Sequence, residues 1–231
     1  MIKHLSAALR YATAVAIVCL TTVSVQADAP ELKPSIAKWK PHMAKFAAAD
    51  KKNPVEPGQI VFVGSSSIVL WKLDKWFPEL DAVNRGFGGS RLEDSVYYAD
   101  QIILPYKPRT VVLYAGDNDL KAGYTPAEVH EDFVEFVEKV RGELPETKIV
   151  YVAVKPSIAR WGMIKEVRET NRLIKAECEK RENCVFVDID TPMQGEDGKP
   201  RKELFVKDGL HLSDEGYAVW VKAVKPHLKD E

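Results

Sequence analysis

Short apolar runs alternate with longer amphipathic segments along most of this chain. Runs rich in Val and Ile at residues 60–63, 82–84, 110–114, 149–154 and 185–187 predict five buried strands. Segments of helical period separate them. This alternation predicts an α/β fold with a parallel sheet.

The clearest helical patterns lie at 126–141 and 165–181, and a last helix is expected at 213–227. In the first of these, Val129, Phe133 and Val137 recur at helical spacing. Thr125 precedes Pro126, which is the usual order of a capping residue and a first-turn proline. These segments form the scaffold of the fold.

Residues 1–27 have the layout of a cleaved secretory signal. Lys3 and Arg10 precede and flank an apolar run at 11–25, which ends in Val25-Gln26-Ala27. The run is shorter than the roughly 20 residues that cross a bilayer. We therefore expect cleavage after Ala27, a secreted or periplasmic protein, and no stable membrane insertion after the signal is removed.

Two further units are predicted in the mature chain. Residues 28–58 form a proline-rich leader with a helix-like stretch at 36–49, whose Trp39, His42 and Phe46 are expected to pack on the sheet. Residues 59–231 form a single domain that is long enough for one core. The net charge of −1 is too mild to suggest a nucleic-acid partner, and the sequence leaves the oligomeric state open.

Cys178 and Cys184 are the cysteines that remain after the signal is removed. They lie six positions apart in the sequence, so either a disulfide or two free thiols fits an oxidising compartment. Neither a Cys-x-x-Cys motif nor a cluster of His accompanies them, and no metal or other cofactor is expected.

The residues after each predicted strand carry the candidate chemistry, because ligands bind at the carboxyl ends of strands in open α/β sheets. Gly64-Ser65-Ser66-Ser67 follows the first strand and contains either an exposed nucleophile or a helix cap. Position 68 is Ile, which excludes the Gly-x-Ser-x-Gly elbow. The P-loop ending is absent too.

Two more strand ends carry polar or glycine-rich turns. Asn84-Arg85-Gly86-Phe87-Gly88-Gly89-Ser90 follows the second strand, where glycines expose backbone amides or simply form a turn. Gly116-Asp117-Asn118-Asp119 follows the third. Asn118 is a candidate hydrogen-bond donor there; an Asx-turn and a calcium site are the alternatives.

A carboxylate and an imidazole lie three residues apart before the last helix, in Asp208-Gly209-Leu210-His211. A carboxylate at this spacing can bind Nδ1 and leave Nε2 free as a base. The other histidines lie in the signal, the leader or predicted helices. A surface turn is the alternative interpretation of this motif.

The four motifs in this order resemble the SGNH/GDSL hydrolases, and 62–68 and 84–90 look most like the subset similar to platelet-activating-factor acetylhydrolases. The resemblance implies a flavodoxin-like three-layer α/β/α sandwich and a triad of Ser66, Asp208 and His211. It also implies an oxyanion hole formed by the amides of Ser66 and Gly89 and the side chain of Asn118. One departure is Ser65, which stands where the family usually has the aspartate of Gly-Asp-Ser.

The function that follows from the resemblance is a serine esterase acting on a small-molecule or glycan ester, with short acyl or acetyl groups expected. Two alternatives stay open: an acyltransferase with the same triad, and a non-catalytic carbohydrate-binding module on the same fold. Trp161 and Tyr124 are the preferred candidates for substrate binding, and Trp71 and Trp76 are further candidates.

Overall fold

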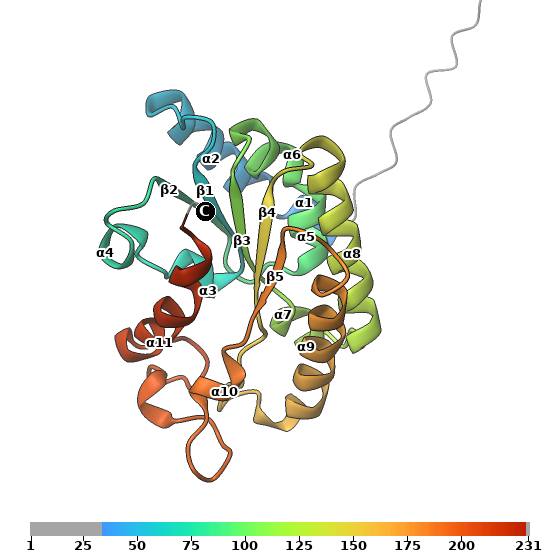
Figure 1. The fold of residues 1–231 in the computed structure, drawn as a ribbon, viewed down its shortest axis with the longest axis vertical. Coiled ribbons are helices and arrows are strands. Elements are labelled where there is room, and N and C mark those ends of the chain that lie inside the picture. Colours follow the sequence, from blue (N-terminus) through green and yellow to red (C-terminus); the bar gives the residue numbers. More distant parts are fainter. Residues whose placement is uncertain (1–33, 230–231) are drawn as a thin grey trace, which may run out of the picture. The chain divides into compact units, whose positions relative to one another are not determined.

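The computed structural model of the chain describes residues 34–229, and within them five parallel strands form one sheet in the order β2-β1-β3-β4-β5 (Figure 1). The predicted signal and its cleavage site lie outside the described residues. The strands are β1 (Ile60–Gly64), β2 (Ala82–Gly86), β3 (Thr110–Tyr114), β4 (Lys148–Val152) and β5 (Cys184–Val187). Each predicted strand is therefore confirmed, with ends that differ by at most two residues.

One change of boundary concerns β2, which continues through Asn84 to Gly86 where a turn was expected. Gly86 pairs with Gly64 at the end of β1. The side chain of Asn84 donates to the carbonyl oxygen of Ile68 at 2.6 Å and accepts from the Gly86 amide at 2.9 Å. These contacts hold a polar residue in an extended strand, so the turn begins only at Phe87.

Helices cover both faces of the sheet, which confirms the three-layer sandwich. One layer contains α5 (Leu92–Tyr97), α8 (Pro126–Glu143) and α9 (Ile164–Cys178), and the other contains α3 (Ser66–Val69), α4 (Leu73–Trp76) and α11 (Asp214–Val224) (Figure 1). The remaining elements are α1 (Pro34–Ala37), α2 (Lys40–Lys52), α6 (Ala99–Ile102), η1 (Leu104–Tyr106), α7 (Asp117–Lys121), η2 (Trp161–Met163), α10 (Asp190–Met193), η3 (Lys202–Leu204) and η4 (Lys225–His227).

An aromatic cluster joins the sheet to α11. Trp220 packs at 4.7 Å from the ring of Tyr114 and 5.4 Å from the ring of Trp71, between ring centroids. Trp71 is 1% exposed. Its suggested role as a wall of the substrate pocket is therefore wrong, because the side chain belongs to the core.

The leader region packs against the turn that follows β2. Trp39 precedes α2 and lies edge-on to Phe87, with ring centroids 5.3 Å apart. A Cβ atom added to Gly89 would lie 3.8 Å from the Trp39 ring. Asp50 of α2 pairs with Arg85 of β2.

Every helix in residues 34–229 is too short or too polar to cross a membrane.

Cys178 and Cys184 lie at the end of α9 and the start of β5. Both are free cysteines in this structure, with Sγ atoms 3.2 Å apart. A disulfide bond is about 2.05 Å long. The sequence left open a disulfide or two free thiols, and the structure contains two free thiols.

Gly64 ends β1 in a conformation that only glycine adopts easily. Its φ is +136°, and an added Cβ would lie 1.9 Å from the carbonyl oxygen of Tyr114 in the neighbouring strand. Gly123 also has a positive φ, +95°, but an added Cβ there meets nothing within 4 Å. Substitutions at these two glycines can therefore distinguish the cost of backbone strain from the cost of a steric clash.

We expect Gly64→Ala to destabilise the fold by more than about 4 kcal/mol, because the methyl group adds a backbone clash to the strain. Gly123→Ala should cost only about 1–2 kcal/mol, since strain acts there alone. Urea denaturation of both variants measures the difference. Equal losses would show that the close approach to Tyr114 does not constrain this strand end.

Candidate active site

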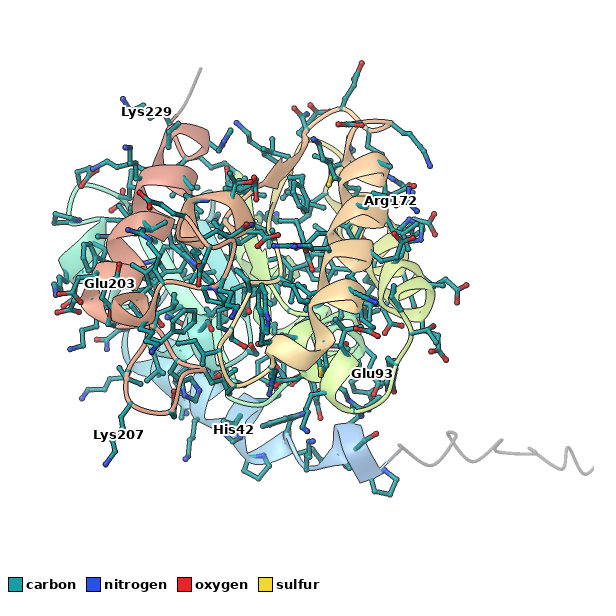
Figure 2. The ribbon with its side chains drawn as sticks, turned by 90° about the horizontal axis from the view of Figure 1, so that it is seen from below. His42, Glu93, Arg172, Glu203, Lys207 and Lys229 are labelled. Atoms are coloured by element: carbon teal, nitrogen blue, oxygen red, sulfur yellow. The ribbon has the colours of Figure 1, made fainter. Side chains whose placement is uncertain are left out.

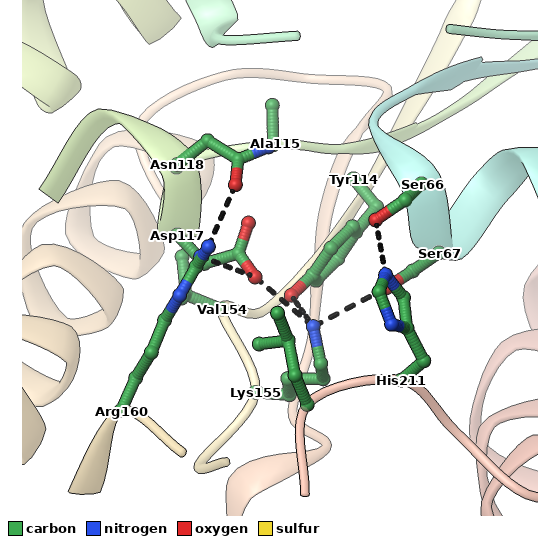
Figure 3. A network of polar contacts seen from close by, with 12 residues as sticks. Ser66, Ser67, Tyr114, Ala115, Asp117, Asn118, Val154, Lys155, Arg160 and His211 are labelled. Carbon is green, nitrogen blue, oxygen red and sulfur yellow. Dashed lines mark hydrogen bonds and ion pairs between the residues drawn. The ribbon is translucent and has the colours of Figure 1, made fainter. Parts of the chain in front are cut away.

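Three side chains from two distant parts of the chain meet at the carboxyl end of the sheet. Ser66 is the first residue of α3, directly after β1, and its Oγ lies 3.1 Å from Nε2 of His211 (Figure 3). Nδ1 of His211 lies 2.6 Å from Oδ2 of Asp208. The structure therefore brings together the serine, histidine and aspartate that the sequence predicted as a triad.

The backbone of the loop before α11 fixes Asp208. Its Oδ1 accepts hydrogen bonds from the amides of Leu210 and His211 at 2.8 and 2.9 Å, with Gly209 at φ +65° completing the turn. The hydrogen bond from His211, and then those amides, lower the pKa of Asp208 to about 2. An ionised Asp208 accepts a hydrogen bond from Nδ1–H of His211, so Nε2 is left as the acceptor that faces Ser66.

Burial separates Ser66 from its two serine neighbours. Ser65 and Ser67 are each 1% exposed, whereas Ser66 is partly exposed. The Ser67 hydroxyl instead accepts a hydrogen bond from Nζ of Lys155 at 3.2 Å. Only the Ser66 hydroxyl is placed to meet both His211 and a molecule arriving from solvent.

Gly89 and Asn118 lie at the carboxyl edge of the sheet, after β2 and β3. A Cβ added to Gly88 would be 3.8 Å from Cβ of Ser66, so the glycine turn lies against the serine. Asn118 is the second residue of the short helix α7 and donates from Nδ2 to the Ser90 carbonyl at 2.9 Å. One amide hydrogen of Asn118 is used there, and the second remains for a ligand.

Arg160 fixes which way the Asn118 amide points. Its Nη2 donates to Oδ1 of Asn118 at 3.0 Å (Figure 3). A guanidinium group has no acceptor, so it must face the amide oxygen and not the nitrogen. The nitrogen of Asn118 is therefore turned toward the Ser90 loop.

Lys155, Asp117 and Arg160 form a buried ion cluster behind these residues. Oδ2 of Asp117 lies 3.0 Å from Nζ of Lys155 and 3.1 Å from Nη1 of Arg160. Burial would raise the pKa of Asp117, but the two cations outweigh it and lower the pKa. For Lys155 burial prevails over the attraction of Asp117, and the pKa is lowered.

Asp119 ties the loops after β2 and β3 together. Its two oxygens accept the amide hydrogens of Leu92 at 2.8 Å and Gly116 at 3.1 Å. Burial raises the pKa of Asp119 to about 7, against the lowering effect of the hydrogen bond from the Leu92 amide. Asp117 and Asp119 are thus committed to cations and amides, and the calcium alternative is not supported.

The suggested substrate aromatics are engaged in contacts of their own. The guanidinium of Arg168 lies 5.8 Å from the ring of Trp161. The Tyr124 hydroxyl accepts from Arg91 at 2.9 Å and donates to Glu93 at 3.2 Å. Neither aromatic lines the groove of about 630 Å³ beside His211, whereas Trp76 does.

The sequence interpretation missed Lys155 and Arg160. The available signal was their place after β4, on the same sheet edge as Asp117 after β3. A lysine that follows a strand is usually solvated, and nothing in its neighbours along the chain indicates burial. Only the paired position of Asp117 across the edge explains it.

Comparison with known proteins gives one family. The sequence model of the GDSL-like Lipase/Acylhydrolase family matches residues 69–219, which include Asn118, Asp208 and His211. None of the curated proteins matches the chain.

Solved structures of low sequence identity share the fold. A structure from Streptococcus pneumonia, described as a candidate platelet activating factor, is 20% identical with a TM-score of 0.74 and covers 84% of this chain and 94% of its own. A GDSL-like lipase from Bacteroides thetaiotaomicron is 19% identical, with a TM-score of 0.70 and coverage of 80% and 96%. An acetylxylan esterase from Geobacillus stearothermophilus is 17% identical, with a TM-score of 0.61 and coverage of 77% and 97%.

We expect Asp117→Asn to lower the free energy of unfolding by about 3–5 kcal/mol, because it leaves Lys155 and Arg160 without a counter-charge in a buried place. Asp100→Asn is the matched control. Asp100 pairs with Lys139 at 2.8 Å, but these side chains are 58% and 36% exposed, and its loss should cost less than about 1 kcal/mol. Chemical denaturation measures both. Equal, small losses would contradict a structural role for the cluster.

Proposed function

This chain belongs to the GDSL-like lipase/acylhydrolase family, and we propose that it is a serine esterase that cleaves carboxylic esters through Ser66, His211 and Asp208. The observation that carries the proposal is the position of His211. Its Nε2 lies 3.1 Å from the Ser66 hydroxyl while its Nδ1 is held 2.6 Å from Asp208. This is the arrangement that general-base activation of a serine requires.

In the proposed acylation step, Ser66 Oγ forms a bond to the ester carbonyl carbon as Nε2 of His211 takes the hydroxyl proton. The carbonyl oxygen becomes an oxyanion. When this intermediate collapses, the bond between the carbonyl carbon and the alcohol oxygen breaks, and His211 gives its proton to the departing alkoxide. Asp208 stabilises the imidazolium between the two transfers.

The oxyanion is proposed to accept hydrogen bonds from the amides of Ser66 and Gly89 and from Nδ2 of Asn118. Amides in the first turn of a helix have no partner within the helix, and Ser66 is the first residue of α3. Arg160 supports this role of Asn118, because it binds the amide oxygen. Each such donor is worth about 100- to 1000-fold in rate.

The exposure of the triad favours hydrolysis over acyl transfer. The side chains of His211 and Asp208 are 30% and 48% exposed, so water can reach the acyl-enzyme. Deacylation repeats the first step with water as nucleophile and releases the acid and free Ser66. A non-catalytic binding module would have no need for a histidine aligned between Ser66 and Asp208.

We further propose that the substrate is a small-molecule or glycan ester of a short acyl group. One structurally similar protein is an acetylxylan esterase, and the family description covers acylhydrolases. The predicted signal at residues 1–27 supports action outside the cytoplasm, after cleavage following Ala27.

The purified protein should hydrolyse p-nitrophenyl acetate, and Ser66→Ala should lower kcat by at least about 10⁴-fold because the nucleophile is lost. Ser65→Ala is the control, because the Ser65 side chain is buried in the adjacent position and takes no part in the proposed reaction. Release of p-nitrophenol measures both. Unchanged turnover in Ser66→Ala would disprove the nucleophile.

Asn118→Ala should reduce kcat by about 100-fold or more, which is roughly 3 kcal/mol of barrier, with KM little changed. Arg160→Met leaves Asn118 in place but frees its amide to rotate, so we expect an intermediate loss of kcat. Steady-state kinetics on one ester measure both variants. A change confined to KM would indicate that Asn118 contacts the substrate in its ground state and does not stabilise the oxyanion.

A further inference from the structure

The groove of about 630 Å³ beside His211 begins at the proposed triad itself. Leu70, on one wall, lies one helical turn after Ser66, and its amide donates to the Ser66 carbonyl at 3.0 Å. Val206, which also lines the groove, donates from its amide to the carbonyl of His211 at 2.9 Å. Each of these two residues is therefore tied by one hydrogen bond to one member of the triad.

The chemistry of the proposed reaction decides which part of an ester occupies this groove. His211 must protonate the alcohol oxygen, so that oxygen has to lie within hydrogen-bond reach of Nε2. Gly89 and Asn118, which would face the oxyanion, come from the loops after β2 and β3. The groove instead belongs to α3, α4 and the loop before α11, on the side of His211.

Resting on the proposed function, we infer that this groove binds the alcohol half of the ester and that it takes a ring-sized, amphipathic alcohol such as a glycoside. The acyl group then points away from the groove. The inference names the part of the substrate that the chain selects.

The lining has the mixed chemistry that such an alcohol needs. Leu70 and Val206 are 47% and 46% exposed, which places two of the five large exposed apolar side chains of residues 34–229 in this groove. Trp76 adds an aromatic ring, and we call the charged lining residues Lys72, Asp214 and Glu215 the rim of the groove. The apolar walls suit the carbon skeleton of a sugar ring, and the rim charges suit its hydroxyl groups.

Neighbouring contacts leave the rim available. Asp214, also at the rim, is held by Lys75 at 2.8 Å, and Lys75 in turn lies 4.7 Å from the ring of Trp76. In the described part of the chain, no ion pair is formed by Lys72 or Glu215, although Lys72 adds to the effect of Lys75 in lowering the pKa of Asp214. These two side chains can therefore turn toward a bound hydroxyl without breaking a pair.

Three acetates test the inference, because each has a primary alcohol of similar reactivity and all give the same acetyl-enzyme. They are ethyl acetate, cyclohexylmethyl acetate and methyl 6-O-acetyl-glucopyranoside. We expect kcat/KM to be highest for the glucoside and lowest for ethyl acetate. The double variant Leu70→Gln/Val206→Asn should lose about 5- to 10-fold on the two bulky esters and little on ethyl acetate.

The rim is tested in the same series. Lys72→Ala/Glu215→Ala should lower kcat/KM for the glucoside about threefold or more, with no change for the cyclohexylmethyl ester, which has no hydroxyl group to bind. Val69→Gln is the control, because Val69 is 46% exposed beside Leu70 but does not line the groove. Its three rates should match those of the wild type.

The deacylation rate separates the two halves of the ester. It is measured from acetyl-enzyme formed with p-nitrophenyl acetate, and it should be the same in wild type and both groove variants, because the alcohol has already left. Slower deacylation, or an equal loss on all three acetates, would overturn the assignment to the alcohol. A preference for the cyclohexylmethyl ester over the glucoside would overturn the glycoside class.

Failure of the proposed function looks different from failure of this inference. If the wild-type protein hydrolyses none of the acetates, including p-nitrophenyl acetate, then the esterase itself is wrong. If it hydrolyses them and the groove variants do not distinguish the alcohols, only the inference is wrong.

Discussion

The ion cluster of Asp117 with Lys155 and Arg160 is the interaction on which the rest of the site depends. Burying a charge costs several kcal/mol, and it persists only where opposite charges and hydrogen bonds meet it with good geometry. Here Asp117 follows β3 and Lys155 follows β4, so the cluster joins neighbouring strand ends. Lys155 also donates to Ser67, beside the proposed nucleophile, and Ser67 in turn accepts from Tyr217 at its carbonyl. A shift of Asp117 would therefore be transmitted to the turn that carries Ser66.

The loop after β4 connects the two halves of the proposed chemistry. Arg160 orients the Asn118 amide, and the amide of Ala159, one residue earlier, donates to the Gly209 carbonyl at 3.0 Å. Gly209 lies between Asp208 and His211 in the acid-base turn. One short segment thus contacts both the oxyanion side and the base side. Reactions that need donors and base to be fixed relative to each other benefit from such a shared support, because misplacement by about 1 Å can cost about 100-fold in rate.

The fold was predictable from the sequence because the strands are buried on both faces, and a run such as 110–114 is too short and too continuously apolar for a surface helix. The meeting of Ser66, Asp208 and His211 was predictable from the resemblance to the SGNH/GDSL hydrolases, which rests on the order of the motifs at the strand ends. The resemblance gives Ser66 as the nucleophile by register, and the three-dimensional structure adds that Ser65 and Ser67 are buried, because burial of neighbouring hydroxyls depends on the helix that follows. For Trp71 and Lys155, too, local sequence does not predict whether the side chain is buried. A tryptophan proposed for the pocket lies in the core, and a lysine that local sequence would place in water is buried, because long-range partners decide both.

Asp117 and Asp208 differ both in their environment and in their proposed role. Asp117, whose role is to stay in place, is buried between two cations, and its environment excludes water. Asp208, proposed to act during turnover, sits at the surface, where Figure 2 shows its neighbour Lys207 pointing outward from the ribbon. Backbone amides and His211 hold its pKa near 2, so it stays ionised without a buried counter-charge. An exposed acid-base turn gives water direct access, which suits hydrolysis. It also means that enclosure cannot select the substrate, so selectivity has to come from the walls next to His211, where Leu70 and Val206 stand.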